Sequence, residues 1–270
     1  MRGPHNLWRL IRTGATFERT GAMKIALAAL DAPPSLRLAA RVLGWPFQWL
    51  GMAGAPSQPP VPRALTALGP AYIKFGQLMS TRPDIVGPDL ARQLTVLQDK
   101  LPPFPEAEAR AEVARELGAP VETIFAEFGP PVAAASLAQV HQATLAATGR
   151  PVAVKVLRPG IERAFLRDVD AFYLAAWLIE TLAPFARRLR PRAVITHFEG
   201  VVQGELDLRM EAAAAAEFHA STESDPRFRV PAVIWPASAR RVLTLEWASG
   251  ITLGDVAALR HGLTIQGADG

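Results

Sequence analysis

The sequence predicts an α+β fold in which a helical region precedes a small antiparallel sheet. Apolar residues recur at three- and four-residue steps within residues 61–100, a spacing typical of helices; they include Leu65, Leu68, Tyr72 and Phe75. After residue 120 the pattern changes. Val152, Val154 and Val156 recur at every second position, which is the period of a half-buried strand. A hairpin signal at Thr148-Gly149 favours antiparallel pairing with the preceding strand.

Size and composition indicate a folded chain without disulfides. The chain has 270 residues, half of them apolar, which suits one large domain or two small ones. It contains no cysteine, so disulfides and thiolate metal sites are excluded. The five histidines are scattered without close carboxylate partners, and we therefore expect no metal site.

The net charge of +4 comes almost entirely from arginine, because only four of the 29 basic residues are lysine. A GC-rich genome is the simplest explanation of that excess. A basic surface favours nucleic acid or an anionic membrane as partner. The sequence contains no nucleic-acid-binding motif, and its arginines are not interleaved with aromatic residues, so we do not expect nucleic acid.

No stretch reaches the roughly 20 apolar residues that a bilayer-spanning helix needs. The closest, residues 42–53, is too short but carries Trp45, Phe47 and Trp49. Such aromatic residues suit a membrane interface, and a packed surface helix explains them equally well. Residues 1–12 contain no apolar run of the kind found in signal peptides.

We divide the chain into four regions. Residues 1–60 form a basic helix-and-linker region. Residues 61–118 form a helical extension with a break at Pro83 and a final helix over 106–117 that stops at Gly118. Residues 119–250 form a sheet-containing lobe, and residues 251–270 begin a further, truncated lobe.

The sheet-containing region has a recognisable order of elements. Strands are predicted at 137–145, 152–157, 230–234 and 242–246, and helices at 161–182 and 194–219. This is the order found in the N-terminal lobe of a protein kinase, with one extra helix after the lysine-bearing strand.

Lys155 is the strongest candidate for a functional residue. A lysine on an otherwise apolar strand is costly to bury unless an anion meets it. Protein kinases use such a lysine to hold ATP phosphates and orient it with a helix glutamate, for which Glu211 is the candidate. Asp207 shares a helix face with Glu211, whereas Glu205 lies about 200° from Asp207 unless the helix distorts near Gly204. The alternative is a solvated acidic face.

Four motifs together resemble the UbiB family of atypical kinase-like proteins, whose mitochondrial members are the ADCK proteins. The resemblance covers roughly residues 60–255. The motifs are Lys74-Phe75-Gly76-Gln77, Ala133-Ala134-Ala135-Ser136, Val152-Ala153-Val154-Lys155 and Glu205-Leu206-Asp207 followed by Glu211. Leu243 to Trp247 looks like the last strand and hinge.

The resemblance implies a nucleotide site that binds ATP or ADP with magnesium. It assigns to that site Lys74, Gln77, Ala133, Ala134, Ala135, Ser136, Lys155, Glu205, Asp207 and Glu246, with Lys155 and Glu211 as an ion pair. In the family, the helix with Lys74 packs over the position of a kinase's peptide substrate, and the resemblance implies that Lys74 reaches the nucleotide pocket, where the carboxylates of Glu205 and Asp207 meet it. The loop is alanine-rich, and alanine restricts the positive φ and close phosphate approach that glycine allows. His141 is expected to be a core or edge residue.

The family's catalytic-loop and metal-binding segments, resembling His-x-Asp-Pro-His-Pro-Gly-Asn and Asp-Phe-Gly, do not occur in this sequence. We therefore expect a chain truncated after the N-terminal lobe, with no complete catalytic set and no metal ligands. Whether it acts as an enzyme by itself stays open.

The sequence is consistent with two functions. The first is the N-terminal part of a UbiB-type atypical kinase or ATPase that supports ubiquinone biosynthesis, peripheral to the cytoplasmic face of a bacterial inner membrane. Ubiquinone precursors, lipids and biosynthetic proteins are then the expected partners. The alternative is a non-catalytic accessory protein that binds nucleotide or lipid at the membrane surface.

Overall fold

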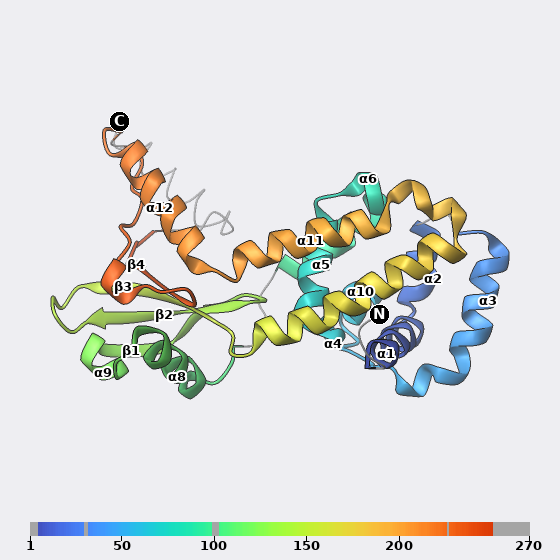
Figure 1. Ribbon diagram of the computed structural model, residues 1–270, viewed down its shortest axis with the longest axis horizontal. Coiled ribbons are helices and arrows are strands. Elements are labelled where there is room, and N and C mark those ends of the chain that lie inside the picture. The colour runs from blue at the N-terminus through green and yellow to red at the C-terminus, as the bar shows by residue number, and fades with distance from the viewer. Residues whose placement is uncertain (1–4, 30–31, 99–102, 226, 251–270) are drawn as a thin grey trace, which may run out of the picture.

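A computed structural model describes residues 5–29, 32–98, 103–225 and 227–250, and it confirms the α+β prediction (Figure 1). The sheet with helices α8 and α9 lies at one end, and the N-terminal helices lie at the other (Figure 1). Helices α10 and α11 run side by side between the two ends, and α12 rises next to the sheet (Figure 1). The predicted start of a further lobe at 251–270 lies outside the described residues.

The N-terminal layer consists of short helices. They are α1 (His5–Thr20), α2 (Ala22–Ala29), α3 (Pro34–Gly44), the 3-10 helix η1 (Trp45–Leu50), α4 (Pro60–Leu68), α5 (Pro70–Ser80), α6 (Pro83–Val86), α7 (Pro88–Leu94) and the 3-10 helix η2 (Thr95–Gln98). The five helices α3 to α7 each begin at a proline, whose missing N–H is no loss in a first turn. The expected break at Pro83 is therefore the start of a new helix.

The sheet has the strand order β1-β2-β3-β4 with every pair antiparallel. Its strands are β1 (Phe125–Ala134), β2 (Ala138–Leu145), β3 (Pro151–Leu157) and β4 (Val242–Glu246), preceded by α8 (Glu106–Leu117) and α9 (Val121–Ile124). The predicted strands at 137–145, 152–157 and 242–246 are thus present. Helix α8 ends where it was expected, since Gly118 takes the left-handed conformation with φ 69°.

Two strand assignments were wrong. β1 was missed because its sequence contains Gly129-Pro130-Pro131 and its pairing with β2 is shifted at three points, which hides any alternation. The predicted strand at 230–234 is only one isolated bridge between Val233 and Leu245. Pro231 lacks the N–H that a continuous ladder requires.

The remaining elements are α10 (Ile161–Leu182), η3 (Pro184–Leu189), α11 (Pro191–Glu205), α12 (Leu208–Thr222) and η4 (Trp235–Ala237). Helix α10 has the predicted bounds. The single helix predicted over 194–219 was wrong, because Leu206 and Asp207 separate α11 from α12. This interruption determines how the acidic side chains are placed.

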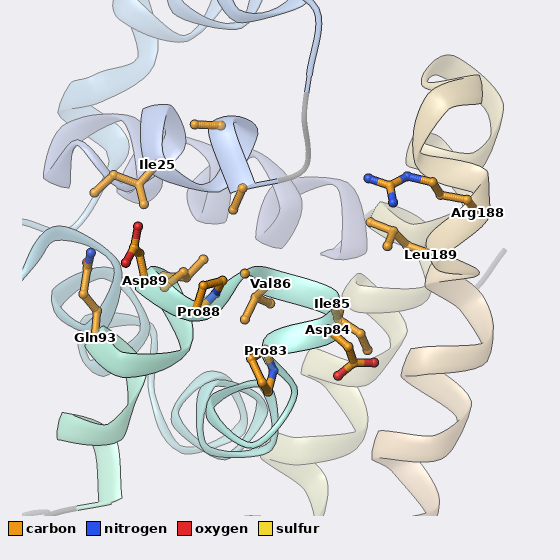
Figure 2. Close-up of a pocket in the computed structure, with 14 residues that line it drawn as sticks. Ile25, Pro83, Asp84, Ile85, Val86, Pro88, Asp89, Gln93, Arg188 and Leu189 are labelled. Carbon is orange, nitrogen blue, oxygen red and sulfur yellow. The ribbon is translucent and has the colours of Figure 1, made fainter.

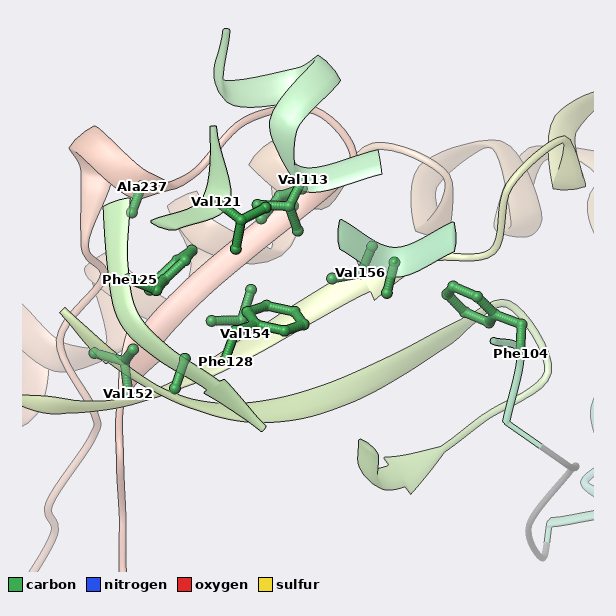
Figure 3. Close-up of a cluster of buried hydrophobic side chains, with 12 residues drawn as sticks. Phe104, Val113, Val121, Phe125, Phe128, Val152, Val154, Val156 and Ala237 are labelled. Carbon is green, nitrogen blue, oxygen red and sulfur yellow. The ribbon is translucent and has the colours of Figure 1, made fainter. Parts of the chain in front are cut away.

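One face of the sheet builds the core. Val152, Val154 and Val156 point toward α8 and pack with Val113 and the phenylalanines of β1 (Figure 3). His141, which pairs with Val154 across the sheet, is fully buried on this face and stacks on Phe128. Burial lowers the pKa of His141, so the imidazole is neutral. Its expected role as a core residue agrees with this environment.

A buried charge cluster joins α8 to the start of β4. The Arg241 guanidinium pairs with Glu112 through Nε, and both side chains are almost fully buried. Its Nη1 lies 2.8 Å from Glu162 on α10, and Nη2 donates to the carbonyl of Arg158 at 3.1 Å. The cluster therefore links the sheet, α8 and the start of α10.

We predict that Arg241→Met destabilises the fold by up to about 3–5 kcal/mol, because the buried Glu112 then loses its buried partner and keeps only Arg115, whose side chain is 62% exposed. Urea unfolding followed by circular dichroism measures the loss. The matched control is Arg92→Met, whose pair with Asp89 is almost fully exposed and should contribute at most about 1 kcal/mol. Equal effects of the two substitutions would contradict the structural role of the cluster.

Candidate functional site

Lys155 lies in a row of residues that crosses the whole sheet. Ala133 pairs with Val140, Val140 with Lys155, and Lys155 with Leu243. Directly opposite residues of neighbouring strands point to the same face. The side chains of Lys155 and Ala133 therefore share the sheet face opposite the valine core.

Helix α12 covers part of this face and brings the acidic partner. Leu208 and Ala212 are buried against Leu157 and Leu243. Glu211 lies three residues after Leu208 and one before Ala212, so it projects along the edge of the same contact. The Lys155 Nζ lies 2.6 Å from Oε2 and 2.9 Å from Oε1 of Glu211. The expected ion pair is therefore formed.

The Lys155–Glu211 pair is partly open to solvent, with side-chain exposures of 32% and 48%. A pair this exposed contributes at most about 1 kcal/mol to stability. Its more important effect is positional. An ammonium group has three N–H donors, and the carboxylate fixes their position without removing the group from solvent. The lysine is thus held where an additional anion can approach it.

The corner between α11 and α12 has a defined cause. Asp207 has an extended backbone, with φ −124° and ψ 95°, and its Oδ1 accepts the backbone N–H of Arg209 at 3.1 Å. It is therefore the N-cap of α12. The prediction that Asp207 and Glu211 share a helix face was wrong, because Asp207 stands outside the helix.

The Asp207 side chain is occupied by Arg209, which sequence reasoning missed. The guanidinium donates through Nε at 2.9 Å and through Nη2 at 2.6 Å, and these bonds lower the pKa of Asp207. The expectation that both carboxylates of the Glu205-x-Asp207 motif meet Lys74 is thus half correct. The sequence does contain a signal for this contact, because Arg209 follows Asp207 by two residues. At this spacing the aspartate can accept both the backbone N–H and the guanidinium N–H groups of the arginine.

Glu205 is the carboxylate that reaches Lys74. The Nζ of Lys74 on α5 lies 2.6 Å from Oε1 of Glu205, the last residue of α11. Gln77, one helical turn further along α5, donates its amide to the carbonyl of Leu97 at 2.7 Å. The two polar residues of this motif therefore contact different elements. Lys74 contacts the end of α11, and Gln77 contacts η2.

Gly76 in the same motif is required by packing. A Cβ at this position would lie 2.4 Å from Cδ1 of Leu97 and 2.7 Å from Cδ1 of Leu65, both of which are buried. A larger side chain would push α5 away from α4 and η2. The glycine thus lets α5 lie close against α4 and η2.

The alanine-rich segment is a tight turn between β1 and β2. Ala133 and Ala134 end β1, and the Ala135 N–H donates to the carbonyl of Ala138 at 2.8 Å. Ser136 is buried. Apart from glycines, Arg190 alone among the described residues has a positive φ, so the turn uses a backbone conformation that alanine adopts without strain.

Glu246 does not join this face by its side chain. It pairs with Val152, which belongs to the core face, and its carboxylate lies 2.6 Å from Arg150 of the β2–β3 hairpin. The Glu246 side chain thus lies on the other face from Lys155, and its assignment to the nucleotide site stays a prediction. The sequence could have shown this placement. Successive side chains of a strand point to opposite faces, so Glu246, three positions after Leu243, points to the other face.

The described residues contain no group of three or more His, Cys, Asp or Glu side chains able to hold a metal ion. Within the same ranges, no helix combines the length and the apolar character needed to cross a membrane. The site consists of two lysine–glutamate pairs, one on each side of the α11–α12 corner. This arrangement on a four-stranded antiparallel sheet defines a kinase-like N-terminal lobe with a helical extension.

Comparison with known proteins identifies the family. A model of the ABC1 atypical kinase-like domain matches residues 96–266. Relatives named "Probable protein kinase UbiB" are 45% identical over 197 residues in Marinobacter nauticus and 47% identical over 201 residues in Xanthomonas campestris pv. campestris, covering 73% of this chain in both cases. The chain belongs to the UbiB family of ABC1 atypical kinase-like proteins.

The matches cover only part of the related proteins. The chain spans 36% of the length of the two UbiB relatives. A solved structure described as Rv3197 with erythromycin, from Mycobacterium tuberculosis, is 30% identical with a TM-score of 0.48. That match covers 73% of this chain and 49% of the solved one.

We predict that Asp207→Ala destabilises the protein by about 1 kcal/mol, because α12 loses its N-cap. Urea unfolding measures the change, and hydrogen exchange should quicken at residues 208–212. The matched control is Asp225→Ala. Asp225 makes the same contacts to Arg227, at 3.1, 2.9 and 2.6 Å, without preceding a helix. A loss of equal size in the control would assign the effect to the arginine pair instead of the cap.

Proposed function

We propose that this chain supplies the nucleotide-binding N-terminal lobe of a UbiB-type atypical kinase or ATPase that supports ubiquinone biosynthesis. The observation that carries the proposal is the Lys155–Glu211 pair on the open face of the sheet. An oriented lysine of this kind contacts the α- and β-phosphates of ATP in kinases. The family membership supports the same conclusion.

In the proposed site, Lys155 binds phosphate oxygens and Glu211 keeps its ammonium in position. The turn at residues 133–136 lies on the same side of the sheet and encloses the phosphates. Magnesium would neutralise the phosphates when bound, and the family's catalytic-loop and metal-binding segments would supply its protein ligands. The lobe itself therefore contributes phosphate binding and orientation.

Lys74 and Glu205 have a proposed control role. Their pair attaches α5 to the end of α11, immediately before the corner that carries Glu211. A helix held across this position restricts access to the nucleotide face. It would exclude a protein substrate and favour ATP hydrolysis or the modification of a small molecule.

We expect Lys155→Met to weaken binding of a fluorescent ADP analogue at least tenfold, because the phosphates lose their cation. Titration of the full chain in the presence of Mg²⁺ measures this. Lys24→Met is the matched control, since Lys24 is an exposed lysine of α2. Equal affinity of Lys155→Met and the control would exclude the proposed phosphate site.

Ala134→Gly and Ala135→Gly are expected to alter the affinity for ATP and ADP. Glycine allows backbone conformations and a closer approach to phosphate that alanine restricts. The same titration applies, with Ala146→Gly in the β2–β3 turn as the control. If both loop variants bind both nucleotides as the parent does, the turn is not part of the site.

A second candidate function rests on an exposed aromatic surface. Trp45 and Trp49 of η1 are 72% and 75% exposed, and Leu43 of α3 is 71% exposed. Arg37 and Arg41 lie on the same helix as Leu43. Aromatic and basic side chains together suit an anionic membrane surface. This would place the chain peripherally at the cytoplasmic face of the inner membrane, as an accessory protein if no second lobe acts with it.

A further inference from the structure

The N-terminal helices, together with α10, η3 and α11, line an apolar cavity that the nucleotide site does not use. Its volume is about 350 Å³, and its walls come from α1, α2, α4, α5, α6, α7, α10, η3 and α11. Small side chains on facing helices leave the space open; they include Ala26, Ala29, Ala175, Ala176 and Ala186. Larger apolar side chains such as Phe75, Met79 and Phe172 complete the lining.

The lining of the cavity has almost no groups that can hydrogen-bond to water. Among the described residues that line it, none is charged, and the hydroxyls belong to Thr13 and Tyr72. These two oxygens lie 2.7 Å apart and satisfy one another. Burial raises the pKa of Tyr72 to about 12, so the phenol stays neutral. Buried water needs two to four polar partners, which this lining does not provide.

The volume is too large for an ordinary packing defect. Ligand sites begin at about 300 Å³, and a cavity of about 150 Å³ already binds benzene. Protein interiors otherwise contain few voids larger than a water molecule. Apolar walls around a space of this size make few dispersion contacts unless an apolar group fills it. An apolar ligand would supply these contacts.

An outer pocket of about 510 Å³ adjoins the cavity (Figure 2). The two share Ala29, Ile85, Val86, Leu90 and Leu189. The outer pocket differs in being polar, because Asp84, Asp89, Gln93 and Arg188 also line it. Figure 2 shows α6 and the start of α7 between Ile25 on one side and Arg188 with Leu189 on the other. The two pockets therefore share part of their walls, and one has a partly polar lining whereas the other is apolar.

We infer that the two pockets together bind a small amphiphile with one hydrocarbon chain, acyl or prenyl. The hydrocarbon chain of the ligand occupies the apolar cavity. Its polar end group stays in the outer pocket, between the carboxylates of Asp84 and Asp89 and the guanidinium of Arg188. This site goes beyond the proposed function, because its geometry does not involve Lys155 or Glu211. Nucleotide binding and amphiphile binding are therefore testable separately.

The probe for this site is cis-parinaric acid, an 18-carbon fatty acid whose fluorescence rises in an apolar environment. It is titrated into the full chain without nucleotide, detergent or vesicles. Ala175→Phe, which fills the cavity from α10, is expected to weaken binding at least tenfold and to leave the melting temperature unchanged or raised. Ala26→Leu fills it from α2 and serves if the first variant does not fold.

Two controls test where the probe binds. Leu166→Phe makes a similar change at a 51% exposed position of α10 outside the cavity and should bind as the parent does. Trp49→Ser removes an exposed aromatic side chain and should also bind normally. Absence of binding by the parent, equal binding by the filled variants, or loss of binding in Trp49→Ser would each overturn the inference.

Competition experiments with the bound probe identify the source of the hydrocarbon chain. Displacement of the probe by free farnesol, without displacement by phosphatidylglycerol vesicles, would support a free prenyl amphiphile. Displacement by the vesicles would support a lipid chain taken from a bilayer. Lys155→Met should bind the probe as the parent does, so a failed nucleotide site and a failed amphiphile site give different results.

Discussion

The corner at Leu206 and Asp207 is the constraint on which the arrangement of the site depends. A continuous helix would direct the carboxylates of Glu205 and Asp207 in nearly opposite directions and would carry Glu211 away from the sheet. The break lets α11 end beside α5, so that Glu205 meets Lys74, while α12 begins over the sheet and brings Glu211 to Lys155.

The corner is itself fixed on both sides by burial. Leu206 belongs to the core between α10 and α11, whereas Leu208 belongs to the cluster beneath α12. The Leu208 N–H also donates to the carbonyl of Arg240 at 2.8 Å, which attaches the start of α12 to the loop before β4. Asp207 then caps the new helix. Two hydrophobic anchors and one backbone hydrogen bond thus hold the turn between two ion pairs.

Helix α5 connects the acidic corner to the apolar interior of the N-terminal layer. Lys74 projects from one side of the helix toward α11, and Tyr72, Phe75 and Met79 line the cavity from the opposite side. The close packing at Gly76 fixes the position of both. The motif at residues 74–77 therefore takes part in an ion pair, in a close helix contact and in the lining of the cavity.

The sequence by itself determined the α+β class, helices α8 and α10, strands β2, β3 and β4, and the pairing of Lys155 with Glu211. These features follow from local periodicity and helix-ending signals, supplemented by a family pattern. It did not determine β1, whose bulges and prolines hide the alternation, or the absence of a strand at 230–234, where Pro231 breaks the ladder.

Only the tertiary structure decided which carboxylate of residues 205–207 meets Lys74 and which cation meets Glu246. Glu205 pairs with Lys74 because α11 ends beside α5. Glu246 lies beside Arg150 because the strand register places it opposite Val152. The cavity between α1, α5 and α10 is equally invisible in the sequence, since alanines that leave a space and alanines that pack closely have the same local pattern. Local preference sets the elements, but partners separated by many residues are chosen by how the elements pack together.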